Sequence, residues 1–335
     1  RVNLYDLLIV AKPDSVFSDK DKVILDQFIM NGGKVLWMID PILTDLDSLR
    51  ERQGTMGITN EMGLYDMLFD YGVRLNRDMV IDYQCAPIAF DAGPMGNQRS
   101  MELFNWYFSP VVIPGDNAHP ISLNLDPILF QFASSLEPVG DDSSVTRTPL
   151  LRSSEISKIL KAPVRVNSGI VNLGIDYFQS NPQPHRTMAM LLEGEFNSNF
   201  QFRLPEKITN DPNIAFRDRS VPTKMIVIGD GDIARNSIIP GGQGPMPVPL
   251  GYDRYAGRVI YDNREFLLNA VNYLLDDKAL ISMRSRSIVL RKLNEEKCLN
   301  ERTFWQVINV VLPLAILAIL GVIQYALRRR KYSHA

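Results

Sequence analysis

The most chemically suggestive residues of this sequence are two closely spaced aspartates, Asp230 and Asp232, in the segment GDGD. They directly follow KMIVI, an apolar run that is typical of a buried strand. Two carboxylates on a tight turn could bind a divalent cation, because such ions prefer oxygen ligands. No third ligand and no EF-hand spacing accompanies the pair. The sequence therefore favours a turn in which glycines permit unusual dihedrals and the carboxylates cap nearby amides.

Further polar residues follow other strand-like segments in the same way. In open parallel sheets, ligands bind beyond the carboxyl ends of the strands, where such residues meet. This position predicts a crevice with polar walls of mixed charge, and it does not identify a ligand. The candidate crevice residues are Lys12, Asp40, Arg152, Ser153, Asp230 and Asp232.

The motifs of several enzyme classes are absent from the sequence. It contains neither a GxxxxGK[ST] nucleotide loop nor a GxSxG nucleophile elbow. None of the three histidines, His119, His185 and His334, has metal-ligand spacing from another His or a Cys. The two cysteines, Cys85 and Cys298, form no CxxC motif and no disulfide framework. We therefore predict a non-enzymatic protein with no catalytic residue, no metal and no cofactor.

The charge balance argues against one class of partner. The sequence has 36 basic and 38 acidic residues, and its formal net charge is −2. Nucleic-acid binding would require a basic face. We therefore expect no nucleic-acid partner.

The C-terminal region predicts a membrane span. Residues 304–327 carry no formal charge and are mostly apolar. As a helix they would be about 36 Å long, which exceeds a hydrocarbon core of about 30 Å. Pro313 is tolerated in such helices, and Gln306, Asn309 and Gln324 could face a partner helix. The anchor residues are Trp305 and Tyr325 at the two headgroup levels, and Arg328, Arg329, Arg330 and Lys331 behind the span.

The basic residues also predict an orientation. Positively charged loops are enriched on the cytoplasmic side of membranes. The basic tail is therefore expected in the cytoplasm, and the large domain on the other side.

The candidate crevice residues can meet only if the strands that they follow lie side by side in an α/β fold. A strand at Tyr5–Ala11, a helix capped by Ser18 and a strand at Val35–Ile39 predict a parallel βαβ unit. Further strands are expected at Thr187–Leu192 and Lys224–Gly229, and a helix begins at Asn263. We also expect a helix that starts after Ser153 and an irregular loop over Ile239–Gly251. The predicted fold is a mostly parallel sheet flanked by helices.

These elements suggest a domain plan. Residues 1–280 would form an extracytoplasmic α/β domain, with a β insertion at 86–147. A charged stalk would follow at 281–303, then the transmembrane helix at 304–327 and a cytoplasmic basic tail at 328–335. The sequence begins at Arg1 without an initiator Met or an export signal, so we expect an upstream part.

An ordered set of segments along almost the whole sequence resembles one family. It is the gliding-motility-associated ABC transporter substrate-binding (auxiliary) protein, the G component of that system. The sequence also resembles the domain of ABC-type uncharacterised transport systems, which is similar in fold to class I glutamine amidotransferases. The segments are SDKDKVILDQFIMNGGKVLWMIDP, YGVRLNRDMVID, NLDPILFQFASSLEP, TPLLRSS, KMIVIGDGDIARN and NREFLLNAVNYLLDD, followed by the span with its RRRK tail.

The resemblance implies a membrane-anchored auxiliary subunit that works with an ABC permease and a separate ATPase. It implies the bacterial inner membrane, with the large domain in the periplasm, and an N-terminal half with its own membrane segment. No amidotransferase chemistry carries over, because no position matches that family's cysteine elbow or its His-Glu partner.

Two other readings of the sequence stay open. One is a membrane-tethered, metal-dependent enzyme that uses the Asp230/Asp232 crevice. The other is a purely structural scaffold of the motility or secretion machinery.

Overall fold

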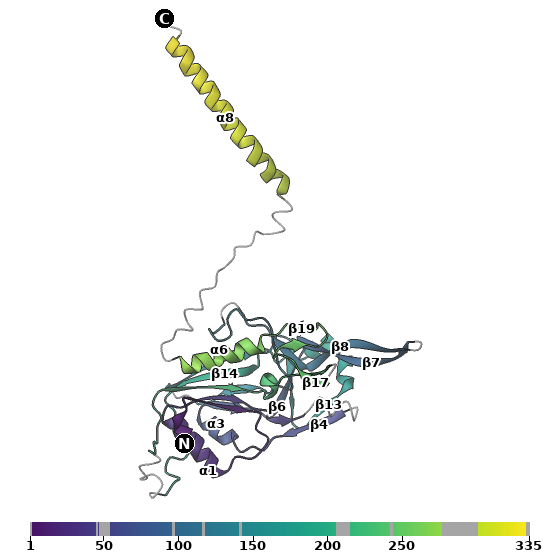
Figure 1. Ribbon diagram of the computed structural model, residues 1–335, viewed down its shortest axis with the longest axis vertical. Helices are drawn as coiled ribbons and strands as arrows, with labels where there is room; N and C mark the ends of the chain where they lie inside the picture. Colours follow the sequence, from purple (N-terminus) through teal and green to yellow (C-terminus); the bar gives the residue numbers. More distant parts are fainter. Residues whose placement is uncertain are drawn as a thin grey trace. The chain divides into compact units, whose positions relative to one another are not determined.

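The computed structural model describes residues 2–44, 46, 54–95, 98–115, 118–140, 143–205, 215–241, 244–276 and 301–332. The chain divides into two units, residues 1–286 and 287–335. Among the described residues, the first unit holds the sheets and most of the helices, and the second holds one long helix (Figure 1).

The first unit opens with the predicted βαβ unit. Strand β1 (Leu7–Ala11) pairs in parallel with β2 (Lys34–Met38), and α1 (Asp19–Met30) connects them. The Ser18 side chain accepts the Asp21 N–H at 3.2 Å, while the Asp21 carboxylate accepts the Ser18 N–H at 3.2 Å. This capping box satisfies two amides that the first helical turn leaves unpaired. The parallel strand pair and the helix cap are thus confirmed.

The central sheet is mixed, so the prediction of a mostly parallel sheet is wrong. Its strand order is β1-β2-β15-β14-β10-β5, and β11 also pairs with β14. Only the β1–β2 and β2–β15 pairs are parallel. The remaining strands are β15 (Thr223–Ile228), β14 (Thr187–Gly194), β10 (Leu136–Pro138), β5 (Val73–Leu75) and β11 (Val145–Arg152).

The connections between the strands explain the antiparallel part. A parallel pair needs a crossover connection, usually a helix. Between β14 and β15, no helix occurs in the described part of residues 195–222, and these strands run antiparallel. The apolar runs of both strands fit a buried strand whether the pairing is parallel or antiparallel. The sequence pattern alone therefore did not distinguish these two arrangements.

Helices cover both faces of the central sheet (Figure 1). Val35 and Trp37 of β2 pack on the side of α1 and α3 (Tyr65–Asp70). Leu36 and Met38 point to the other face, toward α6 (Asn263–Leu275). All four side chains are buried because a strand alternates its side chains between two covered faces.

A second set of strands builds a smaller β lobe with its own core around Trp106, Phe108 and Phe178. The lobe includes a long hairpin that projects from the body of the unit (Figure 1). Its strands are β3 (Ile42–Leu43), β4 (Gly54–Thr59), β6 (Asp78–Asp82), the hairpin β7 (Cys85–Met95) and β8 (Gln98–Val112), β9 (Ile128–Leu129), β12 (Ser157–Lys161) and β13 (Val164–Asn167).

Two local predictions are wrong. The segment after Ser153 forms strand β12 rather than a helix, because Ser154 donates to the Asp82 carboxylate and β12 then pairs with β6. The expected irregular loop contains most of a small hairpin, β16 (Ile238–Gly241) with β17 (Gly244–Pro247), and a second small hairpin, β18 (Tyr252–Asp253) with β19 (Arg258–Val259), follows it. The short helices are η1 (Val2–Leu4), η2 (Ser168–Asn172), α4 (Ile175–Gln179) and η3 (Asp232–Ala234).

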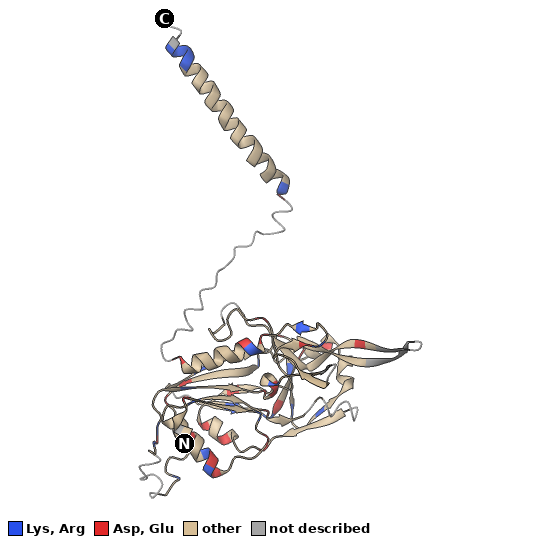
Figure 2. Ribbon diagram, in the orientation of Figure 1, with Lys and Arg blue, Asp and Glu red and all other residues tan. Residues whose placement is uncertain are grey.

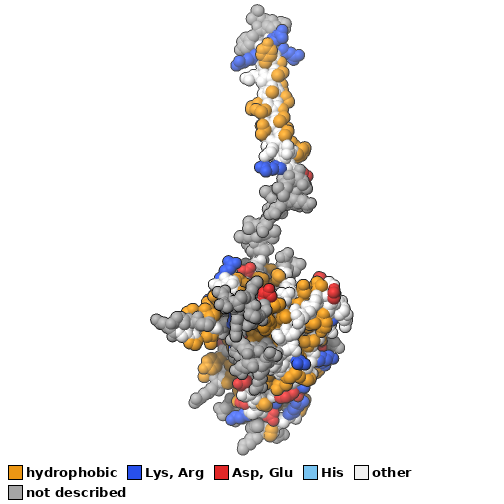
Figure 3. All heavy atoms as spheres, turned by 90° about the vertical axis from the view of Figure 1, so that its right-hand side faces the viewer, with side chains coloured by type: hydrophobic (Ala, Val, Ile, Leu, Met, Phe, Trp, Pro, Cys, Tyr) orange, Lys and Arg blue, Asp and Glu red, His pale blue; other side chains and the backbone are white. Residues whose placement is uncertain are grey.

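The second unit contains helix α8 (Arg302–Tyr332). Its segment Arg302–Lys331 is long and apolar enough to cross a membrane, and none of its most apolar stretch is buried within the chain. Figure 2 shows basic residues at both ends of α8, and Figure 3 shows apolar side chains along its length. Of the expected stalk at 281–303, residues 281–300 lie outside the described residues.

Candidate functional site

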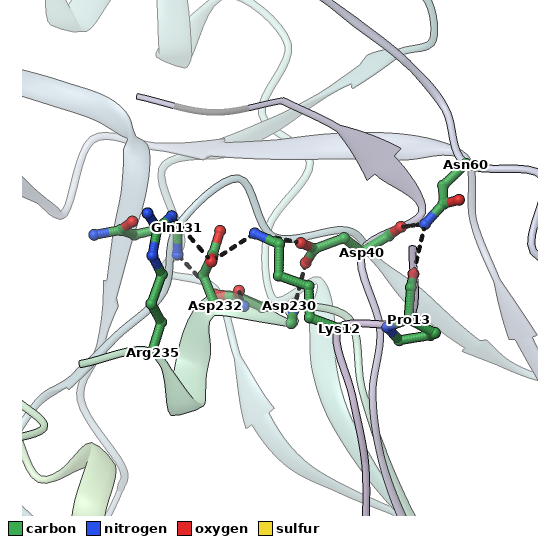
Figure 4. A network of polar contacts seen from close by, with 9 residues as sticks. Lys12, Pro13, Asp40, Asn60, Gln131, Asp230, Asp232 and Arg235 are labelled. Carbon is green, nitrogen blue, oxygen red and sulfur yellow. Dashed lines mark hydrogen bonds and ion pairs between the residues drawn. The ribbon is translucent and has the colours of Figure 1, made fainter. Parts of the chain in front are cut away.

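The carboxyl ends of β1, β2 and β15 lie side by side and bring four predicted residues together (Figure 4). Lys12 directly follows β1, and Asp40 lies two residues beyond β2. Asp230 and Asp232 follow β15. We call these four residues the strand-end cluster.

Lys12 lies between two carboxylates of the cluster. Its Nζ is 3.1 Å from Asp40 Oδ2 and 2.6 Å from Asp232 Oδ1. The Arg235 guanidinium lies 3.5 Å from Asp232 Oδ1. Asp40 and Asp232 are buried to more than nine-tenths, whereas the Lys12 side chain is 38% exposed. The carboxylates of Asp40 and Asp232 are therefore paired with cations within the chain.

The carboxylates also cap backbone amides of the turn. Asp230 accepts the N–H groups of Gln131 and Asp232, both at 2.7 Å. Asp40 accepts the N–H of Gly231. These contacts are the ones expected of a turn that side-chain carboxylates stabilise.

The glycines of GDGD are needed because the backbone packs closely. A Cβ on Gly229 would lie 2.3 Å from the carbonyl oxygen of Ser134. A Cβ on Gly231 would lie 2.9 Å from Lys12 Cβ and 3.0 Å from Asp40 Oδ1. Any larger residue at position 231 would push Lys12 and Asp40 apart.

Burial and the neighbouring charges set the direction of the pKa shifts in the cluster. Loss of water around Asp40 and Asp230 raises the pKa of both carboxyl groups. Burial alone would lower the pKa of Lys12, but the neighbouring charges of Asp40 and Asp232 outweigh it and raise that pKa. Lys12 therefore stays protonated at neutral pH and holds the cluster together.

The cavity beside the cluster is small. Its volume is about 40 Å³. A single water needs roughly 10–15 Å³ by this kind of measure, so the cavity has room for a few waters. Typical small-molecule sites measure about 300 Å³ or more. The lining residues include Gln131, Asp232, Arg235, Tyr252 and Asn263.

Two predicted crevice residues lie outside the cluster. Arg152 is exposed at the end of β11. Ser153 is buried, and its hydroxyl is 2.7 Å from that of Ser157 and accepts the Arg186 N–H at 2.8 Å. Strand β14 separates β11 from β15, so these residues are about 10 Å from the cluster along the sheet.

Sequence reasoning missed two neighbours of the cluster. Arg235 follows Asp232 by three residues, and this spacing could have suggested the ion pair. Gln131 is far away in sequence, and its backbone N–H contacts Asp230 from a loop. No sequence signal predicts that contact.

The described residues contain no group of three His, Cys, Asp or Glu side chains that could hold a metal ion. In the strand-end cluster, the Lys12 ammonium already occupies the position between two carboxylates where a cation would bind. Burial raises the pKa of the Cys85 thiol to about 12, so this cysteine is a poor nucleophile.

The predicted anchor residues all lie in α8. Trp305 donates its indole N–H to Glu301 at 2.9 Å, and Tyr325 is 68% exposed. Pro313 is inside the helix, and the last turn carries Arg329, Arg330 and Lys331, directly after Arg328.

Comparisons with known proteins give one family. A solved structure, the mmIFT52 N-terminal domain, shares 13% identity, covers 82% of this chain and 78% of its own, and has a TM-score of 0.40. This likeness is too loose to carry an argument. No curated protein matches the chain significantly. The family described as ABC-type uncharacterized transport system matches residues 3–270, which include the whole strand-end cluster. The chain belongs to this family of transport-associated proteins.

Proposed function

We propose that this protein is a membrane-anchored, non-enzymatic accessory subunit of an ABC transporter. Its α/β unit would act beside a permease and a separate ATPase subunit. Membership of the transport-system family supports the association with transport. The exposed apolar surface of α8 supports the anchor, and it is the single observation that carries the proposal.

Water is an unfavourable environment for α8. Leu314, Leu317 and Val322 are each more than 60% exposed. Exposed apolar surface costs roughly 25 cal/mol per Å², so a helix that is apolar on most sides requires a lipid or protein partner. A bilayer matches the length of the helix.

The ends of α8 support an orientation. Arg328–Lys331 form a compact basic group, and Arg302 is the basic residue at the other end of the helix. By the positive-inside bias, the basic C-terminal end would lie in the cytoplasm. The α/β unit would then face the periplasm from the bacterial inner membrane.

The strand-end cluster supports a non-enzymatic role. An acid–base or metal-dependent catalyst needs an unpaired group with access to a substrate. Here Lys12 is paired with Asp40 and Asp232, Asp230 is held by two backbone N–H groups, and the adjoining cavity has room for little besides water. The cluster would hold three strand ends in register, so that the α/β unit can present its surface to a partner.

The resemblance of the ordered segments extends the proposal to gliding motility. Deletion of the gene from its host should abolish gliding, and the full chain should restore it. A chain with Lys12→Arg should restore it as well, because that substitution keeps the cation. A deletion strain that glides normally would remove this part of the proposal and leave the transport role untouched.

Co-purification tests the proposed function itself. The full-length protein is solubilised from its native membranes in a mild detergent and isolated through an affinity tag on the α/β unit. A polytopic permease and a Walker-type ATPase should be recovered in stoichiometric amounts. A clean monomer with hydrolytic activity would refute the proposal.

A further inference from the structure

The Gln and Asn residues of α8 all lie on one side of the helix. At about 100° per residue, Gln306, Pro313 and Gln324 lie within about 20° of one another around the axis. Asn309 and Gly321 lie about 60° to either side of them. We call these five residues the amide face.

The amide face carries hydrogen-bonding groups that the helix itself does not satisfy. Pro313 has no N–H, so the carbonyl of Asn309 lacks its usual partner four residues on. The side chains of Gln306, Asn309 and Gln324 are exposed. In a hydrocarbon environment, no water can satisfy such groups, so they favour a partner helix that offers hydrogen bonds.

The amide face also permits close approach. A Cβ on Gly321 would meet no atom within 4 Å. Small residues of this kind allow two helix backbones to pack closely in a membrane. The opposite side of α8 is apolar, with Val311, Ile319 and Val322. A partner would therefore find amide hydrogen-bonding groups on one face only.

Charges at the two ends of the amide face select the kind of partner. Arg302 and Arg328 lie within about 40° of its centre, one at each end of the apolar segment. Two anchored copies of this chain would have the same orientation, so these arginines would face their own counterparts. Like charges in such positions repel each other. A second copy is therefore a poor occupant.

We propose that the amide face binds a transmembrane helix of a different subunit. The complementary helix carries amide or hydroxyl side chains within the membrane and acidic side chains near its ends. This proposal rests on the proposed function, in which α8 crosses the membrane beside a permease. It adds the side of α8 that contacts the partner and the chemistry of the contact.

Photocrosslinking in native membranes tests which side is occupied. A photoreactive amino acid replaces Leu317, which lies about 20° from the centre of the amide face, or Ile319, which lies on the opposite side. The full-length chain is used in both cases. Position 317 should give a cross-link to a different membrane protein, and position 319 should give none.

A double substitution tests the hydrogen bonds. Gln306→Leu with Gln324→Leu makes the helix more apolar, so membrane insertion is retained. The co-purified partner should fall roughly threefold per amide removed, the factor that an average hydrogen bond between membrane helices carries. The control is Ile308→Leu with Ile319→Leu on the opposite side, which should leave recovery unchanged.

Three results would overturn the proposal: a cross-link to a second copy at position 317, equal cross-linking from both positions, or unchanged recovery of the partner with the double variant. A full-length chain that is absent from membranes would instead refute the proposed function.

Discussion

Lys12 is the residue on which the strand-end cluster depends. Replacing it by Met would leave the buried carboxylate of Asp40 without its cation and Asp232 with only the more distant Arg235. Breaking a fully buried pair costs about 3–5 kcal/mol. Because Lys12 is partly exposed, we expect Lys12→Met to lower the free energy of unfolding by about 2 kcal/mol.

The matched control is Lys22→Met. Lys22 pairs with Asp19, whose side chain is 93% exposed, so the loss of this pair should change stability by less than about 0.5 kcal/mol. Urea denaturation of both variants gives the comparison. Equal stability losses in the two variants would show that the cluster does not hold the strand ends.

The geometry of the strand-end cluster predicts that divalent cations do not change the thermal stability of the protein. With the Lys12 ammonium 2.6 Å from Asp232, a metal ion would have to displace a bound cation from a buried site. Addition of millimolar Mg²⁺, Ca²⁺, Mn²⁺ or Zn²⁺ should leave the thermal midpoint unchanged. A stabilising shift that Asp232→Ala abolishes would support a metal-dependent enzyme and contradict our account.

At the residue scale, the sequence predicted four of the six crevice residues as neighbours. The rule that parallel strands end at one edge correctly joined Lys12, Asp40, Asp230 and Asp232. It failed for Arg152 and Ser153, because β14 lies between β11 and the parallel strands. Strand order depends on contacts between distant segments, which local patterns do not encode.

At the element scale, the start of helix α1 is clearly marked in the local sequence by its capping residues. Ser18 and Asp21 form the reciprocal cap, so Ser18→Ala should cost about 1 kcal/mol of stability. The control Ser15→Ala removes a hydroxyl that bonds only to its exposed neighbour Asp14, and it should be nearly neutral. Thermal or urea unfolding measures both. If the two substitutions had the same effect, the cap would contribute nothing.

The contact between His119 and helix α6 predicts that the stability of the protein depends on pH. The His119 ring meets that of Tyr273 edge-to-face at 4.9 Å, and burial lowers the pKa of His119 below its usual 6.5. Glu193 opposes this shift and Lys224 reinforces it. A lowered folded pKa means that the contribution of His119 to stability is complete above pH 6.5. It is lost as the pH falls through the folded pKa.

Thermal unfolding between pH 7.5 and pH 5 checks this prediction. The protein should lose stability over this range, and His119→Phe, which keeps the aromatic contact, should lose less. Parallel curves for the two proteins would show that His119 contributes nothing to the pH dependence.

At the element scale, the sequence predicted what local patterns determine. The βαβ unit and α6 follow from apolar periodicity and capping residues. Strand β12 was missed because its helix-like start at Ser153 and Ser154 is overridden by pairing with β6. The likeness of the fold to glutamine amidotransferases stays a prediction.

At the scale of the whole molecule, the protein combines two units with different surfaces. The α/β unit buries its apolar side chains in two layers, and its buried carboxylates accept hydrogen bonds or pair with Lys12. Helix α8 keeps its apolar side chains exposed. Composition and length alone predicted this division, because a long uncharged segment is visible in the sequence without knowledge of the fold.

The most direct test of this account is where the full-length chain goes after cell lysis and high-speed centrifugation. We predict that it stays in the membrane pellet through an alkaline carbonate wash and is released only by detergent, whereas a chain that ends at Asp276 remains in the supernatant. An intact full-length chain in the supernatant would contradict the membrane anchor, and with it the proposed place beside a permease.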